Sequence, residues 1–79
     1  MEYKKPIIGE YYIDYEDGEI ILILGEIPLN VFPYTYECKV IKRGIYDESP
    51  IINIKKYSIY TINNHFSSIK KEMVFWELL

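Results

Sequence analysis

A chain of 79 residues builds one domain around one small core and leaves little room for a deep, enclosed active site. It contains no alanine and no glutamine but 15 isoleucines and 9 tyrosines, which suit a pleated sheet better than a helix, so we predict an all-β fold. The net charge is −3, and no apolar run approaches the ~20 residues of a membrane span. A single cysteine excludes an intramolecular disulfide, and the charged N-terminus lacks a long apolar segment, so we expect a cytoplasmic protein.

The charges are divided unevenly between the two halves of the chain. Residues 1–37 carry eight acidic residues and two lysines, a net charge of −6. Residues 38–79 carry seven basic and four acidic residues, a net charge of +3. Such asymmetry indicates a charged binding surface, unless a small barrel interleaves the two halves in space so that the charges cancel.

The first half of the chain predicts a β-hairpin followed by a loop. Residues 10–15 alternate in polarity with the two-residue period of a half-buried strand. The dipeptide Asp17-Gly18 then supplies the positive φ angles of a tight turn. Residues 19–24 are apolar on both faces, which predicts a strand with little exposure on either side. Residues 25–33 contain two prolines and predict a loop that packs over one end of the fold.

The second half of the chain predicts the remaining strands. Residues 34–43 alternate cleanly, and residues 51–62 form a long β-rich run. The pattern of that run slips near Lys55-Lys56, which indicates a bulge or a break between two strands. Residues 63–69 predict a turn or a single 3₁₀ turn, and residues 73–78 predict the final strand. About five short strands favour a small closed barrel, because closure removes exposed sheet edges.

The spacing of aromatic residues and glycines resembles a known family across most of the chain. The segments that carry the resemblance are Gly9-Glu10-Tyr11-Tyr12, Asp17-Gly18, Ile23-Leu24-Gly25, Tyr36-Glu37-Cys38-Lys39-Val40, Tyr60-Thr61-Ile62 and Phe66. They resemble the SH3-like (Src-homology-3-like) small β-barrel proteins of short bacterial and phage open reading frames. The resemblance implies a small SH3-like barrel and carries no catalytic residue. From the strand pattern, the side chains expected in the core are Ile13, Leu22, Leu24, Tyr36, Cys38, Val40 and Trp76.

The residues that could carry chemistry lack the partners that they would need. His65 is the sole histidine, and Cys38 lies on the predicted inner face of its strand, so no nucleophile–base pair is visible. One cysteine and one histidine do not fill a zinc site, and the acidic segment 14–19 lacks the ligand spacing of a calcium loop. We therefore expect a protein that is not an enzyme and has no metal and no cofactor.

The acidic hairpin and the tyrosines carry the binding hypothesis. Tyrosine is enriched at protein interfaces, and a cluster of carboxylates attracts a basic partner surface. We predict a small protein-binding module that occupies the basic, nucleic-acid-binding surface of a host or defence protein, as a phage or mobile-element inhibitor would. The residues expected to contact the partner are Tyr12, Asp14, Glu16, Asp17 and Glu19.

Other interpretations of the same residues stay open. The hairpin acids can form a solvated turn without a partner. A nucleic-acid-binding small barrel would use the tyrosines as stacking surfaces, although the net negative charge argues against it. A structural or assembly subunit would pack residues 20–24 or 74–79 against a copy of itself, as a homo-oligomer. The bases available for the nucleic-acid interpretation are Lys39, Lys42, Arg43, Lys55 and Lys56.

Overall fold

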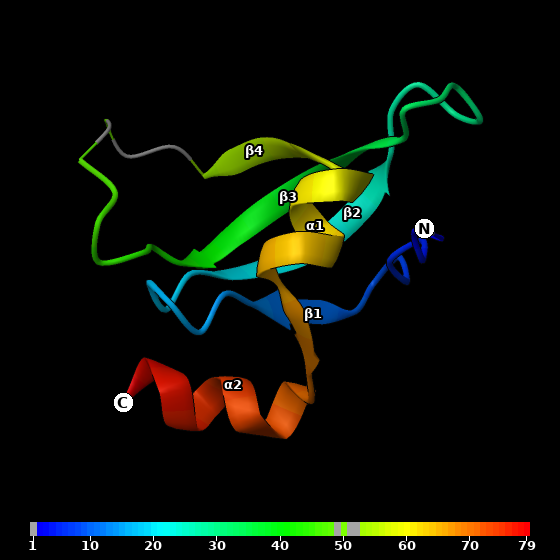
Figure 1. Ribbon diagram of the computed structural model, residues 1–79. Helices are drawn as coiled ribbons and strands as arrows, with labels where there is room; N and C mark the ends of the chain where they lie inside the picture. The colour runs from blue at the N-terminus through cyan, green and yellow to red at the C-terminus, as the bar shows by residue number, and fades with distance from the viewer. Residues whose placement is uncertain (1, 49, 51–52) are drawn as a thin grey trace.

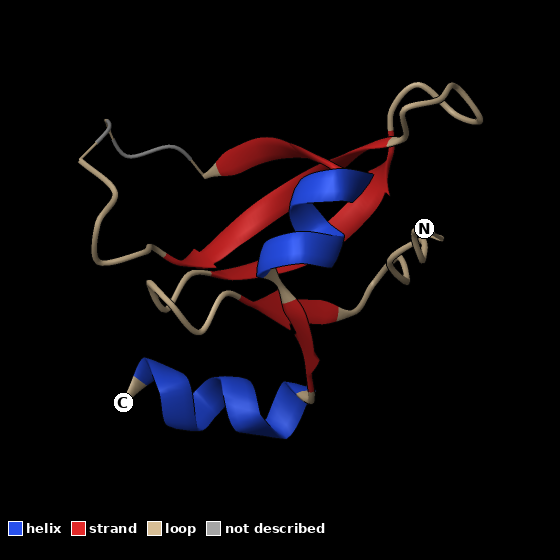
Figure 2. Ribbon diagram, in the orientation of Figure 1, coloured by secondary structure: helices blue, strands red, loops and turns tan. Residues whose placement is uncertain are grey.

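The computed structural model describes residues 2–48, 50 and 53–79, which form one sheet with two short helices (Figure 1, Figure 2). The strands are β1 (Tyr11–Ile13), β2 (Ile20–Glu26), β3 (Thr35–Lys42), β4 (Ile54–Ser58) and β5 (Ser67–Ile69), and the helices are α1 (Ile59–His65) and α2 (Lys71–Leu78). All neighbouring strands are antiparallel, in the order β4-β3-β2-β1-β5. The predominantly β character predicted from the composition is confirmed.

The sheet formed by the described residues is open, so the predicted closed barrel is wrong. β4 and β5 lie at the two edges of the sheet and do not pair with each other. Residues 73–78, the predicted final strand, belong to α2 (Figure 2). The fold limits the exposure of its sheet faces by packing one helix against each of them, rather than by closing a barrel.

The predicted β1–β2 hairpin is confirmed. The two strands pair with Tyr12 opposite Ile21. The Gly18 N–H donates to the Asp14 carbonyl over 2.7 Å and closes the turn. Gly18 has a φ of 79°, a left-handed conformation that glycine adopts without steric cost. The strand bounds differ from the expectation, because β1 has three residues and β2 continues to Glu26.

The long β-rich run predicted over residues 51–62 ends at Ser58, where α1 begins. Within that run, Ile51 and Ile52 lie outside the described residues. Ser58 caps α1, since its Oγ accepts a hydrogen bond of 3.2 Å from the Thr61 N–H. The first helical turn then buries Ile59 and Ile62, which share one helix face. The predicted break near Lys55-Lys56 therefore falls two residues later, and the expected turn over 63–69 is the end of α1 followed by β5.

The C-terminal segment is helical although its aromatic and apolar side chains suit a strand. The Lys70 carbonyl accepts hydrogen bonds from the N–H groups of Met73 and Val74, which start the helix. Lysine, glutamate, methionine and leucine make up most of α2, and all four have high helix propensity. Helix propensity and the contact of Val74 with the sheet therefore outweigh the strand preference of the remaining residues.

The sheet buries side chains on both faces, one cluster beneath each helix. The cluster on the α1 face comprises Ile21, Ile23, Tyr36, Cys38, Ile59, Ile62 and Phe66. The cluster on the α2 face is smaller and comprises Ile13, Ile20, Ile69 and Val74. β2 contributes alternate isoleucines to both clusters, as its two-faced apolar pattern predicts. The sheet is therefore a central layer, and its α2 face is the less completely covered.

The predicted core is confirmed in part. The fully buried members are Ile13, Tyr36 and Cys38. The members that are only partly buried are Leu22 and Val40. Leu24 is 40% exposed, because the pairing of β2 with β3 shifts register at this residue. Trp76 is 70% exposed, because it lies on α2 rather than on a strand of the sheet.

Candidate functional site

Two of the acids in the predicted site shape the hairpin turn with their carboxylates. Asp14 Oδ1 accepts a hydrogen bond of 2.9 Å from the Glu16 N–H. Asp17 Oδ1 accepts a hydrogen bond of 2.9 Å from the Glu19 N–H. Such side-chain-to-backbone bonds stabilise turns. Asp14 and Asp17 are half-buried and Glu16 is exposed, so the hairpin presents less free charge than the sequence suggested.

Glu19 is buried and does not face solvent, which corrects its place in the predicted site. Its side chain is 5% exposed. Glu19 Oε2 accepts a hydrogen bond of 2.9 Å from Lys55 Nζ, and Oε1 accepts one of 2.5 Å from the Tyr57 hydroxyl. Lys55 Nζ also donates to Asp47 Oδ2 over 2.8 Å. Glu19 therefore belongs to an internal polar network that joins the β1–β2 turn, β4 and the loop after β3.

Burial and the carboxylate of Glu19 shift the pKa values of the groups in and beside this network. Burial, followed by the nearby charge of Glu19, raises the pKa of the Cys38 thiol to about 12. Burial and then the hydrogen bond to Glu19 raise the pKa of Tyr57. Burial alone would lower the pKa of Lys55, but its hydrogen bonds to Asp47 and Glu19 outweigh that effect and raise it. At neutral pH the thiol, the phenol and the ammonium group therefore all keep their protons.

Tyr12 packs inward rather than beside the hairpin acids. Its ring lies against the cluster on the α1 face, and its hydroxyl accepts a hydrogen bond of 2.9 Å from the Ile7 N–H. The rings of Tyr3 and Tyr60 also pack together, edge to face, with centroids 4.6 Å apart. Most tyrosines thus bury part of the ring, and the strongly exposed ones are Tyr15 and Tyr46.

A second polar cluster fastens the loop between β2 and β3. The Glu26 carboxylate accepts hydrogen bonds from the Asn30 N–H at 2.7 Å and from the Tyr36 hydroxyl at 2.8 Å. These two bonds, in that order, lower the pKa of Glu26. Lys5 Nζ lies 3.3 Å from Glu26 Oε1 and 3.9 Å from the centre of the Tyr34 ring. This cluster connects the N-terminal segment to the sheet and also has a structural role.

The bases proposed for a nucleic-acid-binding face are partly engaged within the protein. Lys55 lies in the internal network, and Lys42 Nζ donates to the Glu77 carbonyl over 2.9 Å. Lys56 stands directly opposite Glu37 in the β3–β4 ladder. The nucleic-acid interpretation is therefore left with fewer available bases than the sequence suggested.

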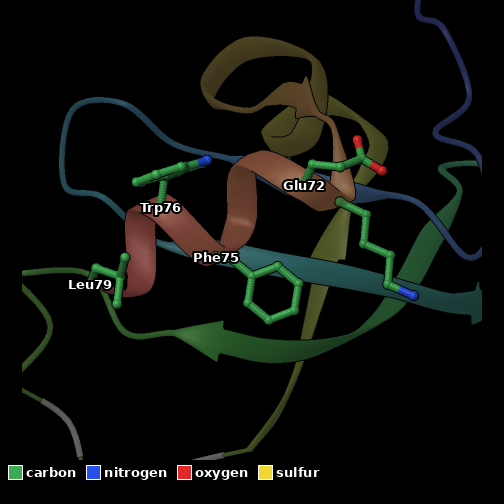
Figure 3. Close-up of a pocket in the computed structure, with 5 residues that line it drawn as sticks. Glu72, Phe75, Trp76 and Leu79 are labelled. Atoms are coloured by element: carbon green, nitrogen blue, oxygen red, sulfur yellow. The ribbon is translucent and has the colours of Figure 1, made fainter.

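The outer side of α2 carries several exposed apolar side chains. The helix buries Val74 alone. Phe75 is 67% exposed, Trp76 70% and Leu79 96%. Figure 3 shows these three side chains projecting from the helix around a shallow pocket. We call this surface, which comprises Phe75, Trp76 and Leu79, the α2 surface.

Two contacts link the helix that carries the α2 surface to the sheet. Val74 packs into the cluster formed with Ile13, Ile20 and Ile69. The hydrogen bond from Lys42 Nζ to the Glu77 carbonyl holds the C-terminal turn of the helix. The exposed rings are therefore carried by a helix that contacts the sheet at these two points.

The described residues contain no group of three histidine, cysteine, aspartate or glutamate side chains arranged to hold a metal ion. Among the same residues, neither helix has the length and apolar character required to cross a bilayer. No protein-family model, curated protein or solved structure matches this chain. The resemblance to SH3-like barrels therefore stays a prediction, and the function is argued from the surface of the molecule itself.

The sequence contained a signal for the α2 surface that the strand interpretation concealed. Read as a helix, residues 71–79 place apolar side chains around most of the circumference, without a continuous polar stripe. A short helix of this kind at the surface of a small domain must expose some of those side chains. This pattern indicates an exposed apolar surface only if the segment is taken as a helix. The aromatic pair Phe75-Trp76 suits a strand as well, so the sequence left the choice between helix and strand ambiguous.

Proposed function

We propose that this protein is a small, non-enzymatic protein-binding module that contacts its partner through the α2 surface. The observation that carries the proposal is the exposure of Phe75, Trp76 and Leu79 on a helix that packs on the sheet through Val74. Tryptophan and phenylalanine are enriched at protein interfaces, and tryptophan is prominent among the residues that contribute most binding energy. Scattered apolar residues are normal on a protein surface, but contiguous ones on one element indicate an interaction site.

The predicted hairpin site is the competing location for the same function. Of its acids, Glu16 remains exposed, whereas Glu19 is buried. A partner with a basic surface would meet Asp14, Glu16 and Asp17 at the turn. The hairpin thus retains some negative charge but lacks the apolar anchors that the α2 surface offers.

Site-specific crosslinking distinguishes the two surfaces. A photo-crosslinking phenylalanine derivative is placed at Trp76, at Glu16 or at Leu29, in separate variants expressed in the native host. Leu29 is the matched control, because it is an apolar residue with 71% exposure in a loop away from α2. We expect protein adducts from position 76 and none from position 29. Adducts from position 16 alone would locate binding at the hairpin, and equal yields at all three positions would contradict the proposal.

A further inference from the structure

We propose that the α1 face of the sheet carries a binding pocket for a small organic anion, in which an apolar group bears one carboxylate. The pocket lies between the N-terminal segment, α1 and the β1–β5 pair, and its volume is about 230 Å³. It shares no residue with the α2 surface, so this proposal does not depend on the proposed function.

Hydrogen bonds hold the walls of the pocket together. Asn63, on α1, is bonded to the backbone of the N-terminal segment. Its Oδ1 accepts from the Lys4 N–H over 2.9 Å, and its Nδ2 donates to the Lys4 carbonyl over 2.8 Å. On the other side, the Ile7 N–H donates to the Tyr12 hydroxyl of β1 over 2.9 Å. The N-terminal segment is therefore bonded both to α1 and to β1, and the space between them is the pocket.

One part of the lining is apolar. Ile62 and Phe66 are buried members of the cluster on the α1 face, and they line the pocket together with Pro6 and Ile7. A hydrocarbon group in contact with these side chains would be removed from water, which favours binding. The volume is that of roughly eight water molecules, so the apolar group is a single ring or a short chain.

The polar part of the lining offers hydrogen-bond donors and no carboxylate. The Tyr12 hydroxyl accepts from the Ile7 N–H and keeps its own proton for a further acceptor. Ser68 stands directly opposite Tyr12 in the β1–β5 ladder, so the two side chains lie on the same face of the sheet. Within the described part of the chain, the Ser68 hydroxyl has no hydrogen-bond partner and the Lys4 ammonium group has no ion-pair partner.

These donors indicate the charge of the ligand. Two hydroxyl groups and one ammonium group match a carboxylate, which when ionised only accepts hydrogen bonds. A cation would find no opposite charge in the lining, and a pure hydrocarbon would leave the donors without an acceptor. An anion with a small apolar body is therefore the class of ligand that uses both parts of the lining.

The test compares benzoate with benzamide, its uncharged analogue of nearly equal size. Binding to the full chain at pH 7 is followed by proton–nitrogen correlation NMR. We expect benzoate to shift the amide signals of Ile7, Tyr12 and Ser68 and to saturate with a Kd of about 1 mM, as suits so small a ligand. Benzamide should bind at least about five-fold more weakly, because hydrogen bonds to an ionised acceptor are the stronger ones.

The decisive variant is Ser68→Ala, which removes one donor from the pocket. Its matched control is Ser67→Ala, the same change at the neighbouring exposed residue, whose side chain lies on the other face of the sheet. Ser68→Ala should weaken benzoate binding about ten-fold, and Ser67→Ala should leave it within about two-fold. Tyr12→Phe should also weaken it, but this variant loses the bond from the Ile7 N–H as well.

Shifts that do not saturate, or that fall on residues away from the pocket, overturn the proposal. Equal binding of benzoate and benzamide overturns it too, because the donors would then not select an anion. Equal effects of Ser68→Ala and Ser67→Ala place the ligand outside the pocket and have the same consequence. None of these results bears on the α2 surface, which crosslinking at position 76 tests separately.

Discussion

Removing the cation from the internal network should destabilise the fold far more than removing its exposed neighbour. Lys55 Nζ donates to Glu19 at 2.9 Å and to Asp47 at 2.8 Å. The three side chains are 22%, 5% and 15% exposed, respectively. The variant Lys55→Met keeps most of the aliphatic stem but leaves two carboxylates without their shared cation. Breaking a fully buried pair costs about 3–5 kcal/mol, and the partial exposure of Lys55 lowers our expectation to about 2–3 kcal/mol.

The measurement is the free energy of unfolding by urea at pH 7, followed by far-ultraviolet circular dichroism. The control is Lys56→Met, the next residue of β4, whose side chain is exposed and stands opposite Glu37. An exposed pair contributes about 0–1 kcal/mol, so this variant should lose no more than that. The two substitutions are chemically identical and differ in position by one residue. The difference between their losses of unfolding free energy therefore measures the effect of burying the network.

A double-mutant cycle tests whether the loss arises from the pair itself. Glu19→Gln keeps an acceptor for the Tyr57 hydroxyl but removes the negative charge from the network. Combined with Lys55→Met, it should lose less free energy than the sum of the two single losses, because the second change removes a charge that the first left unpaired. If Lys55→Met falls within about 0.5 kcal/mol of Lys56→Met, Glu19 is solvated and the reasoning fails.

Two further predictions concern the core and the dependence of stability on pH. Ile21→Ala should lower the free energy of unfolding by about 2–5 kcal/mol, because Ile21 is fully buried. Leu22→Ala should lower it by about half as much or less, because Leu22 is only partly buried. Urea unfolding of both variants measures these losses, and equal losses would contradict the assignment of the two residues to different faces of β2. Burial raises the pKa of Cys38 to about 12, and burial followed by hydrogen bonds to carboxylates raises the pKa values of Tyr36 and Tyr57. Because the unfolded chain ionises first, near pH 9 to 10, these groups contribute their full stability below that range and lose it as the pH rises beyond it. Urea unfolding from pH 7 to 11 should show the decline, and a flat profile would refute it.

The hairpin and the alternating strand could be predicted because both depend on local patterns. Asp17-Gly18 supplies the turn within the hairpin, and the alternation over residues 34–43 matches β3. Tyr36 and Cys38 were placed in the core from that alternation alone, and both are buried. These features require no knowledge of distant contacts.

The burial of Glu19 could not be predicted in the same way. Its partner Lys55 lies 36 residues away in the sequence. Only the pairing of β2 with β3 and of β3 with β4 brings the two side chains together. From the sequence, Glu19 is one more acid beside a turn, and a solvent-facing site was the natural interpretation. Long-range strand pairing thus removed a residue from the predicted site without any local signal.

The sequence contained a local signal for the start of α1, but the strand preference of the neighbouring β-branched residues outweighed it. Ser58 precedes the helix, and its hydroxyl caps the Thr61 N–H. The isoleucines at 59 and 62 share one helix face, but isoleucine also has high strand propensity. In a chain with 15 isoleucines, propensity discriminates poorly between helix and strand. The capping serine was therefore the more informative residue.

The wrong prediction for residues 73–78 and the proposed binding surface have one physical origin. The segment is apolar in nearly every direction, so a strand between two covered faces could bury it, whereas a helix on one face of a sheet cannot. α2 directs Val74 to the sheet and leaves Phe75 and Trp76 in water. Each ring left exposed forgoes about 1.5–3 kcal/mol of hydrophobic stabilisation, which a small domain of marginal stability can recover only by covering it. No element in the described part of the chain covers these two rings, and under the proposed function a partner would cover them.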